Sequence, residues 1–116
     1  MKLSLIGTIV GLAATANAKT VTCCDRDGGN CTTVIEGTST SPMTMHNALG
    51  TKKIVKLSQS ERSTFFGRTA ILYDHISQDG FTFRLEVIHG KMPTAQVLTP
   101  AGQVYAQLPE CRVFDY

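Results

Sequence analysis

Alternating apolar and polar residues mark the second half of the chain. In residues 80–88, Phe81, Phe83, Leu85 and Val87 occupy every second position, and mostly polar residues stand between them. This period of two is typical of a β-strand with one buried face. Shorter β-rich runs occupy residues 69–75, 94–98, 103–108 and 111–114, with proline or glycine between several of them. The pattern predicts an antiparallel meander.

Residues 41–50 show a different pattern. Ser41 precedes Pro42, as an N-cap residue precedes a proline at the first helical position. A partial apolar stripe then follows, and Gly50 is placed to end a helix. We therefore predict a helix over residues 41–50. The expected fold class is α+β, with one helix packed on a four- to five-stranded antiparallel sheet.

The first 18 residues have the layout of a secretory signal. Lys2 precedes an apolar run over residues 3–14, and Ala16-Asn17-Ala18 fits a cleavage site. The run is too short to span a bilayer, which needs about 20 apolar residues. We expect a signal peptide over residues 1–18 and a single secreted, soluble domain over residues 19–116. We expect a monomer with no membrane partner.

Four cysteines fit this secreted location. Cys23, Cys24 and Cys31 lie near the start of the predicted domain, and Cys111 lies near its end. An even number of cysteines in an oxidising compartment predicts two disulfides, and the adjacent pair lacks the spacing of a zinc site. Adjacent cysteines rarely bond to each other, so Cys23 pairs with Cys31 and Cys24 with Cys111, or the reverse. The long loop is worth about 4 to 5 kcal/mol and the short loop about 2 to 3.

Charge gives little support for strong nucleic-acid binding. Without Lys2, ten basic residues stand against nine acidic ones. We therefore expect RNA affinity no better than micromolar, weakened steeply by salt. The basic residues Lys52, Lys53 and Lys56 are interpreted as a solvated face. Phe65 and Phe66 are interpreted as buried anchors of a loop, and a base-stacking platform beside Arg62 and Arg68 is the alternative.

A candidate site emerges from one predicted hairpin. Asp79-Gly80 is a strong two-residue turn signal before the alternating run. With these residues in the turn, His75 faces Arg84 and Tyr73 faces Glu86, so four polar side chains share one face of the sheet. The apolar residues that then share the opposite face are Leu72, Ile76, Phe83 and Val87.

The cysteine spacing and two short motifs resemble a known family. The chain is similar to the fungal guanyl-specific ribonucleases, and closest to the ribonuclease-like secreted effector candidates of powdery mildew fungi. The residues that carry this likeness are Cys23, Cys24, Gly28-Gly29-Asn30-Cys31, Tyr73-Asp74-His75, Gly80-Phe81-Thr82-Phe83 and Cys111. The resemblance implies a microbial ribonuclease-like α+β fold. The spacing of eight residues from Cys23 to Cys31 is similar to that of the family, and the resemblance implies the pairing Cys23–Cys31 and Cys24–Cys111.

The same resemblance implies an incomplete catalytic set. Tyr73 and His75 match a charge-stabilising pair, Glu86 matches the general base, and Asp79 could replace the base-reading acid. The family's arginine position holds Ala95, and its late histidine has no counterpart before Cys111. The expected function is that of a catalytically inactive secreted effector that binds host proteins, RNA or both, with Tyr73, His75, Asp79, Arg84 and Glu86 as binding residues. Its transfer into host cells is left open.

Two other interpretations fit the residues. One is a weakly active secreted guanyl-specific ribonuclease, and the other is an unrelated all-β effector or toxin held by the same disulfides. Asn30-Cys31-Thr32 is an N-glycosylation sequon, so Asn30 is a candidate glycosylation site. We expect no metal and no cofactor.

Overall fold

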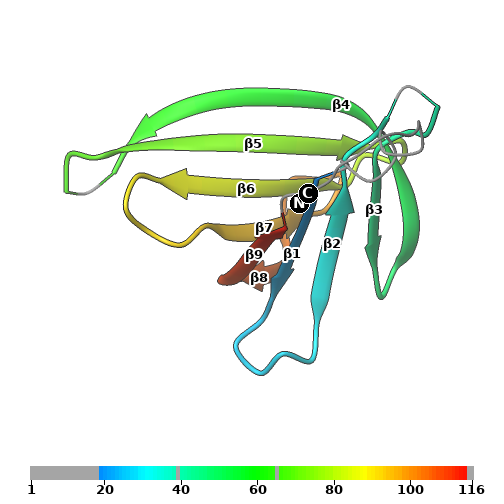
Figure 1. The fold of residues 1–116 in the computed structure, drawn as a ribbon, viewed down its shortest axis with the longest axis horizontal. Coiled ribbons are helices and arrows are strands. Elements are labelled where there is room, and N and C mark those ends of the chain that lie inside the picture. Colours follow the sequence, from blue (N-terminus) through cyan, green and yellow to red (C-terminus); the bar gives the residue numbers. More distant parts are fainter. Residues whose placement is uncertain (1–18, 39, 65, 115–116) are drawn as a thin grey trace, which may run out of the picture.

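The computed structural model describes residues 19–38, 40–64 and 66–114, and the predicted signal peptide lies outside this part. The described residues form nine strands: β1 (Thr20–Cys24), β2 (Cys31–Ile35), β3 (Thr44–Asn47), β4 (Gly50–Ser63), β5 (Thr69–Ser77), β6 (Thr82–Ile88), β7 (Thr94–Leu98), β8 (Val104–Leu108) and β9 (Glu110–Phe114). They pair in the order β8-β7-β6-β5-β4-β3-β2-β1-β9, and every pair with a given register is antiparallel. The sheet curls into a nearly closed barrel (Figure 1).

The predicted helix over residues 41–50 is wrong, and with it the α+β fold class. This segment forms β3 and the turn into β4. Met45 is fully buried between the less buried Thr44 and His46, so the segment follows a strand period and not a helical one. The main-chain N–H of Leu49 donates to Asn47 Oδ1 at 2.9 Å, which closes the turn. Pairing with β2 and β4 thus outweighs the local helix signals.

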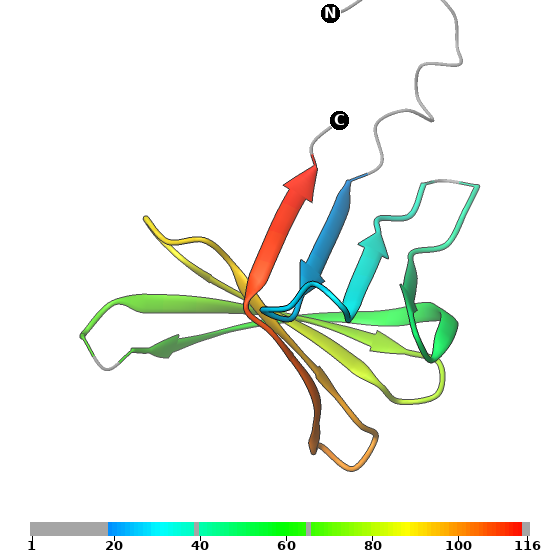
Figure 2. The same cartoon turned by 90° about the horizontal axis from the view of Figure 1, so that it is seen from below.

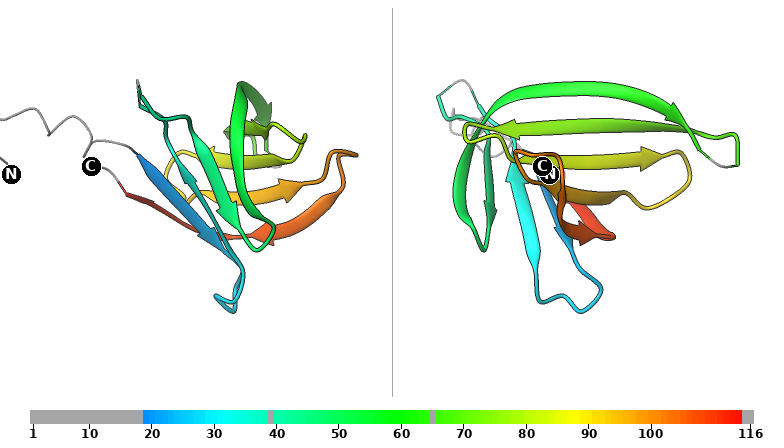
Figure 3. Two further views of the ribbon diagram at one scale, coloured as in Figure 1. Left: turned by 90° about the vertical axis from the view of Figure 1, so that its right-hand side faces the viewer. Right: turned by 180° about the vertical axis from the view of Figure 1, so that it is seen from behind.

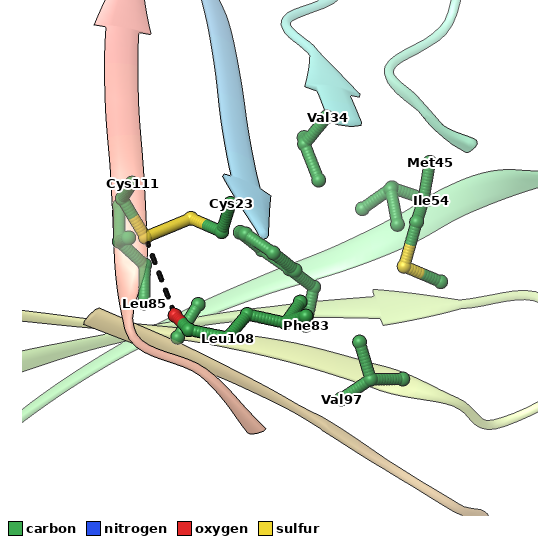
Figure 4. Close-up of a cluster of buried hydrophobic side chains, with 10 residues drawn as sticks. Cys23, Val34, Met45, Ile54, Phe83, Leu85, Val97, Leu108 and Cys111 are labelled. Carbon is green, nitrogen blue, oxygen red and sulfur yellow. Dashed lines mark hydrogen bonds between the residues drawn. A yellow bond between two sulfur atoms is a disulfide. The ribbon is translucent and has the colours of Figure 1, made fainter. Parts of the chain in front are cut away.

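The long strand β4 joins the two halves of the barrel. Its first residues pair with β3, and the rest pairs with β5. The views of Figures 2 and 3 show β1, β2, β3 and β9 inclined against the sheet of β4 to β8. The buried cluster between the two halves comprises Cys23, Val34, Met45, Ile54, Phe83, Leu85, Ala95, Val97, Leu108 and Cys111 (Figure 4).

One covalent bond lies where the barrel nearly closes. β8 and β9 are the two end strands of the sheet, and only Pro109 separates them in the chain. The Cys23–Cys111 disulfide joins β1 to β9, and Cys111 Sγ lies 3.8 Å from the carbonyl oxygen of Leu108 (Figure 4). This bridge therefore fixes the last strand against the core.

The disulfides are Cys23–Cys111 and Cys24–Cys31, so the pairing implied by the family resemblance is wrong. Side chains on a strand alternate between faces, so adjacent cysteines in β1 point to opposite sides. Cys23 points into the core and lies directly opposite Cys111, with a Cα–Cα distance of 3.9 Å. Cys24 lies directly opposite Cys31, with a Cα–Cα distance of 4.0 Å. Strand register therefore decides between the two connectivities.

Candidate functional site

The turn between β5 and β6 sets the geometry of the predicted site. Ser77 N donates to the carbonyl of Phe81 at 2.8 Å, so residues 78–80 form a three-residue loop. Gly80 adopts a positive φ of 93° at the last loop position, where glycine avoids the Cβ penalty. The Ser77 hydroxyl accepts a hydrogen bond from Phe81 N at 3.0 Å. The predicted two-residue turn, with Asp79-Gly80 in the middle, is therefore wrong.

The longer loop shifts the register by one residue. Asp74 pairs with Arg84 and His75 pairs with Phe83, in place of the predicted His75–Arg84 and Tyr73–Glu86 pairs. Tyr73 packs against the hydrophobic core. Because paired residues share a face, Arg84 and Glu86 lie on the outer face and Tyr73 and His75 on the inner one. The predicted four-residue site is thus divided between the two sides of the sheet.

His75 has a structural role on the inner face. Its Nδ1 lies 3.1 Å from the carbonyl oxygen of Phe83, so a protonated Nδ1 donates a hydrogen bond to this acceptor. The two rings also meet edge to face, with centroids 5.5 Å apart. These contacts orient the imidazole toward its cross-strand neighbour.

The outer face carries two ion pairs. Arg84 donates two hydrogen bonds to Asp74, from Nε at 2.8 Å and from Nη2 at 2.9 Å. These bonds to Asp74 raise the pKa of Arg84 above its ordinary value. Arg62 Nη2 donates to Glu86 Oε2 at 2.6 Å. Because each of these four charges has an opposite partner, the two ion pairs present little net field to a charged ligand, whereas the exposed Lys56 adds a positive charge to the same face.

A shallow hollow of about 510 Å³ opens on this outer face. Three residues of the two ion pairs line it, namely Arg62, Arg84 and Glu86. Gln96 and Gln107 also line it, and Gln96 Nε2 donates to Gln107 Oε1 at 3.2 Å. The N–H groups that Arg62 and Arg84 do not use in these pairs can donate hydrogen bonds to a polar ligand in the hollow.

Asp79 belongs to the turn and not to the divided site. Lys52 Nζ donates to Asp79 Oδ2 at 2.6 Å and lies 4.6 Å from the centroid of the Phe81 ring. The hydrogen bond from Lys52, followed by that from Ser77, lowers the pKa of Asp79. The interpretation of Lys52 as part of a solvated face is therefore wrong, whereas Lys53 and Lys56 are exposed. The carboxylate of Asp79 thus accepts hydrogen bonds from Ser77 in the turn and from Lys52.

Asn30 ends the β1–β2 loop next to the exposed disulfide. It is exposed, and its Nδ2 donates to Asp25 Oδ2 at 3.1 Å. Gly29 N donates to the other carboxylate oxygen of Asp25 at 3.0 Å. A glycan would be attached to Asn30 Nδ2, the nitrogen that donates to Asp25. Glycosylation of Asn30 stays a prediction.

Two exposed apolar residues lie in turns at the same end of the barrel, one at the end of the β4–β5 hairpin and one in the loop from β6 to β7. Phe66 is 78% exposed, so its interpretation as a buried anchor is wrong, and Phe65 lies outside the described residues. Met92, in the loop from β6 to β7, is 72% exposed. Periodicity gives no signal for side chains in turns, and the exposure of both depends on the long-range strand pairing.

Comparisons with known proteins found no match for the chain: no family model, no curated protein and no solved structure matches it. The ribonuclease resemblance therefore rests on the short sequence motifs alone. Among the described residues, no group of three or more His, Cys, Asp or Glu side chains is arranged to hold a metal ion. The same part of the chain contains no helix long and apolar enough to cross a membrane.

Proposed function

We propose that this chain is a secreted, disulfide-stabilised all-β protein of the effector or toxin kind, which acts by binding and not by catalysis. The observation that carries the proposal is the β5–β6 register, in which His75 and Glu86 belong to opposite faces of the sheet. The ribonuclease-like frame required a helix over residues 41–50, and that segment is a strand and a turn.

The argument against catalysis is that His75 and Glu86 cannot both reach the same cleavage site. General acid–base catalysis of RNA cleavage needs its groups within about 3 Å of atoms on the same substrate. Side chains on opposite faces of a sheet diverge, so one RNA cannot contact both groups. Each is also engaged elsewhere, His75 near the carbonyl of Phe83 and Glu86 with Arg62. This geometry favours a binding protein over a weak ribonuclease.

The disulfides support the secreted part of the proposal. Both bridges are compatible with an extracellular protein, because disulfides persist mainly in oxidising compartments. A chain of this size gains a large share of its stability from such bonds. A protein that must keep its shape outside the cell and present surface loops to a partner benefits from this construction.

An RNA cleavage assay tests the proposal. Oxidised protein from a secretory expression host is incubated with guanosine-containing RNA, beside the variants His75→Ala and Glu86→Ala. Matched controls are His46→Ala, in β3, and Glu61→Ala, in β4. We expect no cleavage above that of heat-denatured protein from any of these chains. Turnover that disappears in both site variants and persists in both controls would show that the protein is an enzyme.

A further inference from the structure

Two neighbouring turns form one end of the barrel. Ser63 pairs with Thr69 at the end of the β4–β5 hairpin, and Ala70 pairs with Ile88 beside it. The loop that follows β6 therefore starts next to the hairpin end; both turns lie at the left in Figure 1, and their tips are apart in Figure 2. A hollow of about 590 Å³ between the bases of the two turns is lined by Arg68, Thr69, His89 and Gly90. We call Phe66, Arg68, Lys91 and Met92 the tip surface.

The tip surface combines the two most exposed large hydrophobic side chains of the described chain. Phe66 and Met92 exceed all other large hydrophobic residues in exposure. Both stand on turns beyond the last paired residues of their strands, where nothing in the barrel core requires an apolar side chain. Phe66 and Met92 thus place one large apolar side chain on each of two turns at the same end of the barrel.

The charge of the two turns has one sign. Residues 64–68 and 89–93 contain Arg68 and Lys91 and no acidic residue. Arg62 is close along the chain, but its guanidinium is paired with Glu86. The tip surface therefore carries two cations and no acidic residue of its own, although the exposed Glu61 lies two residues before the end of β4 and the net charge of the whole chain is only +2. Apolar tips flanked by cations are complementary to a surface that is negatively charged outside and apolar beneath.

We propose that the tip surface docks on an anionic lipid bilayer. Phe66 and Met92 enter the interface, and Arg68 and Lys91 contact the negatively charged headgroups. The expectation of no membrane partner rested on the lack of a spanning segment, whereas peripheral docking needs only apolar tips and nearby cations. The inference deepens the proposed function by naming its partner, and it rests on that binding role.

Single-stranded RNA is the other polyanion to weigh, and the tip surface suits it less well. Sequence-tolerant RNA binding uses a positive groove along the backbone and several aromatic rings on which bases stack. Met92 offers no aromatic face, and the two cations form a small patch and not a track. A bilayer accepts any apolar side chain at its interface, so it fits a phenylalanine and a methionine equally well.

Vesicle flotation tests the inference with the oxidised protein from a secretory host. The vesicles contain either phosphatidylcholine alone or phosphatidylcholine with about 30% phosphatidylserine. We expect binding to the anionic vesicles only, and each neutralising variant, Arg68→Gln or Lys91→Gln, should weaken it about fivefold. Phe66→Ser and Met92→Ser should each weaken it about tenfold or more, because they remove the inserted apolar group.

Matched controls come from the opposite end of β4. Lys53→Gln removes one exposed positive charge, and Leu49→Ser removes one exposed apolar side chain from the β3–β4 turn. Both controls should bind anionic vesicles as well as the unaltered protein does. Because all six positions are exposed, thermal unfolding should show that every variant keeps its fold.

Three results would overturn the inference. They are no binding to anionic vesicles by folded protein, equal binding to neutral vesicles, and tip variants that bind like the controls. Single-stranded RNA that displaces the protein from vesicles, and whose own binding the four tip variants weaken, would assign the tip surface to nucleic acid instead. The RNA cleavage assay is separate, so failure here would leave the proposal of a non-catalytic binding protein standing.

Discussion

Removal of each disulfide in turn should show that the two bonds contribute very different amounts to the free energy of unfolding. The compared variants are Cys23→Ala with Cys111→Ala, and Cys24→Ala with Cys31→Ala. The first bond spans 88 residues and the second spans 7. In the chain-entropy model, these loop lengths correspond to about 4.6 and about 2.4 kcal/mol of stability.

Burial of the Cys23–Cys111 bridge increases the difference between the two stability losses. The long-range bridge lies in the core, where Cys23 is fully buried and Cys111 contacts the Leu108 carbonyl. Each deleted sulfur leaves a space comparable to a methylene group, worth roughly 1 kcal/mol. The Cys24–Cys31 bridge lies at the outer end of a hairpin, where Cys31 is exposed. We therefore expect losses of about 6.6 and about 2.4 kcal/mol.

Guanidinium unfolding followed by circular dichroism measures both losses. Small domains have total stabilities of about 5 to 15 kcal/mol, so the core variant should be largely unfolded or close to it. The hairpin variant should stay folded with a lower midpoint. Equal losses, or a larger loss for the hairpin variant, would refute the pairing. If Cys24 were bonded to Cys111, changing Cys24 and Cys31 together would break both bridges.

Three further changes test the fold. Phe83→Ala, at the centre of the core with no exposed surface, should cost about 3 to 5 kcal/mol in urea unfolding, and a loss below about 1 kcal/mol would contradict its place there. Gly80→Ala should cost about 1 to 3 kcal/mol, since φ is 93° and a Cβ would lie 3.2 Å from Pro100, whereas the control Gly29→Ala, with open space around it, should be nearly neutral. The folded-state pKa of Asp79 lies below its ordinary value of 3.8, so its charge stabilises the fold above that pH, and this contribution disappears as the pH falls through the folded pKa. Acid unfolding of Asp79→Asn should therefore depend less on pH below about 4 than that of the unaltered protein, and parallel curves would contradict the role of the turn carboxylate.

The strands of the second half were largely predictable because their signals are local. Residues 82–88 and 94–98 alternate or form short β-rich runs, and both are strands in the structure. The helix over residues 41–50 failed because Ser41-Pro42 and Gly50 satisfy helix-end rules that a turn and a hairpin satisfy equally well. The single buried residue Met45 decides for a strand, and its burial depends on partners elsewhere in the chain.

The candidate site failed for a subtler reason. Asp79-Gly80 marks a turn correctly, but a two-residue and a three-residue loop differ by one position in register, and that difference exchanges the faces. The burial argument favoured the wrong register because it placed Leu72 and Ile76 with the core and Tyr73 and His75 outside. In the structure, the amphipathic Tyr73 packs against the core instead.

The β4–β5 hairpin has an open outer edge along part of β4. Among the described strands, β3 pairs with β4 on that side only as far as Lys53. At the hairpin end, Thr64 N donates to the carbonyl of Arg68 at 2.7 Å, and direct hydrogen-bonded pairs alternate along an antiparallel ladder. The backbone groups of Leu57, Gln59 and the residues alternating with them therefore point away from β5.

This edge carries features that oppose pairing with a second copy. A register shift between Ile54 and Lys56 interrupts the strand near its start, as bulges do on protected edges. In an antiparallel pairing centred on Gln59, Lys56 of one copy would face Arg62 of the other, and symmetry would place this repulsion twice. The edge is thus a poor self-association site in that register. The proposed membrane contact lies instead at the end of the hairpin, where Phe66 and Arg68 are exposed beyond the last paired residues of β4 and β5.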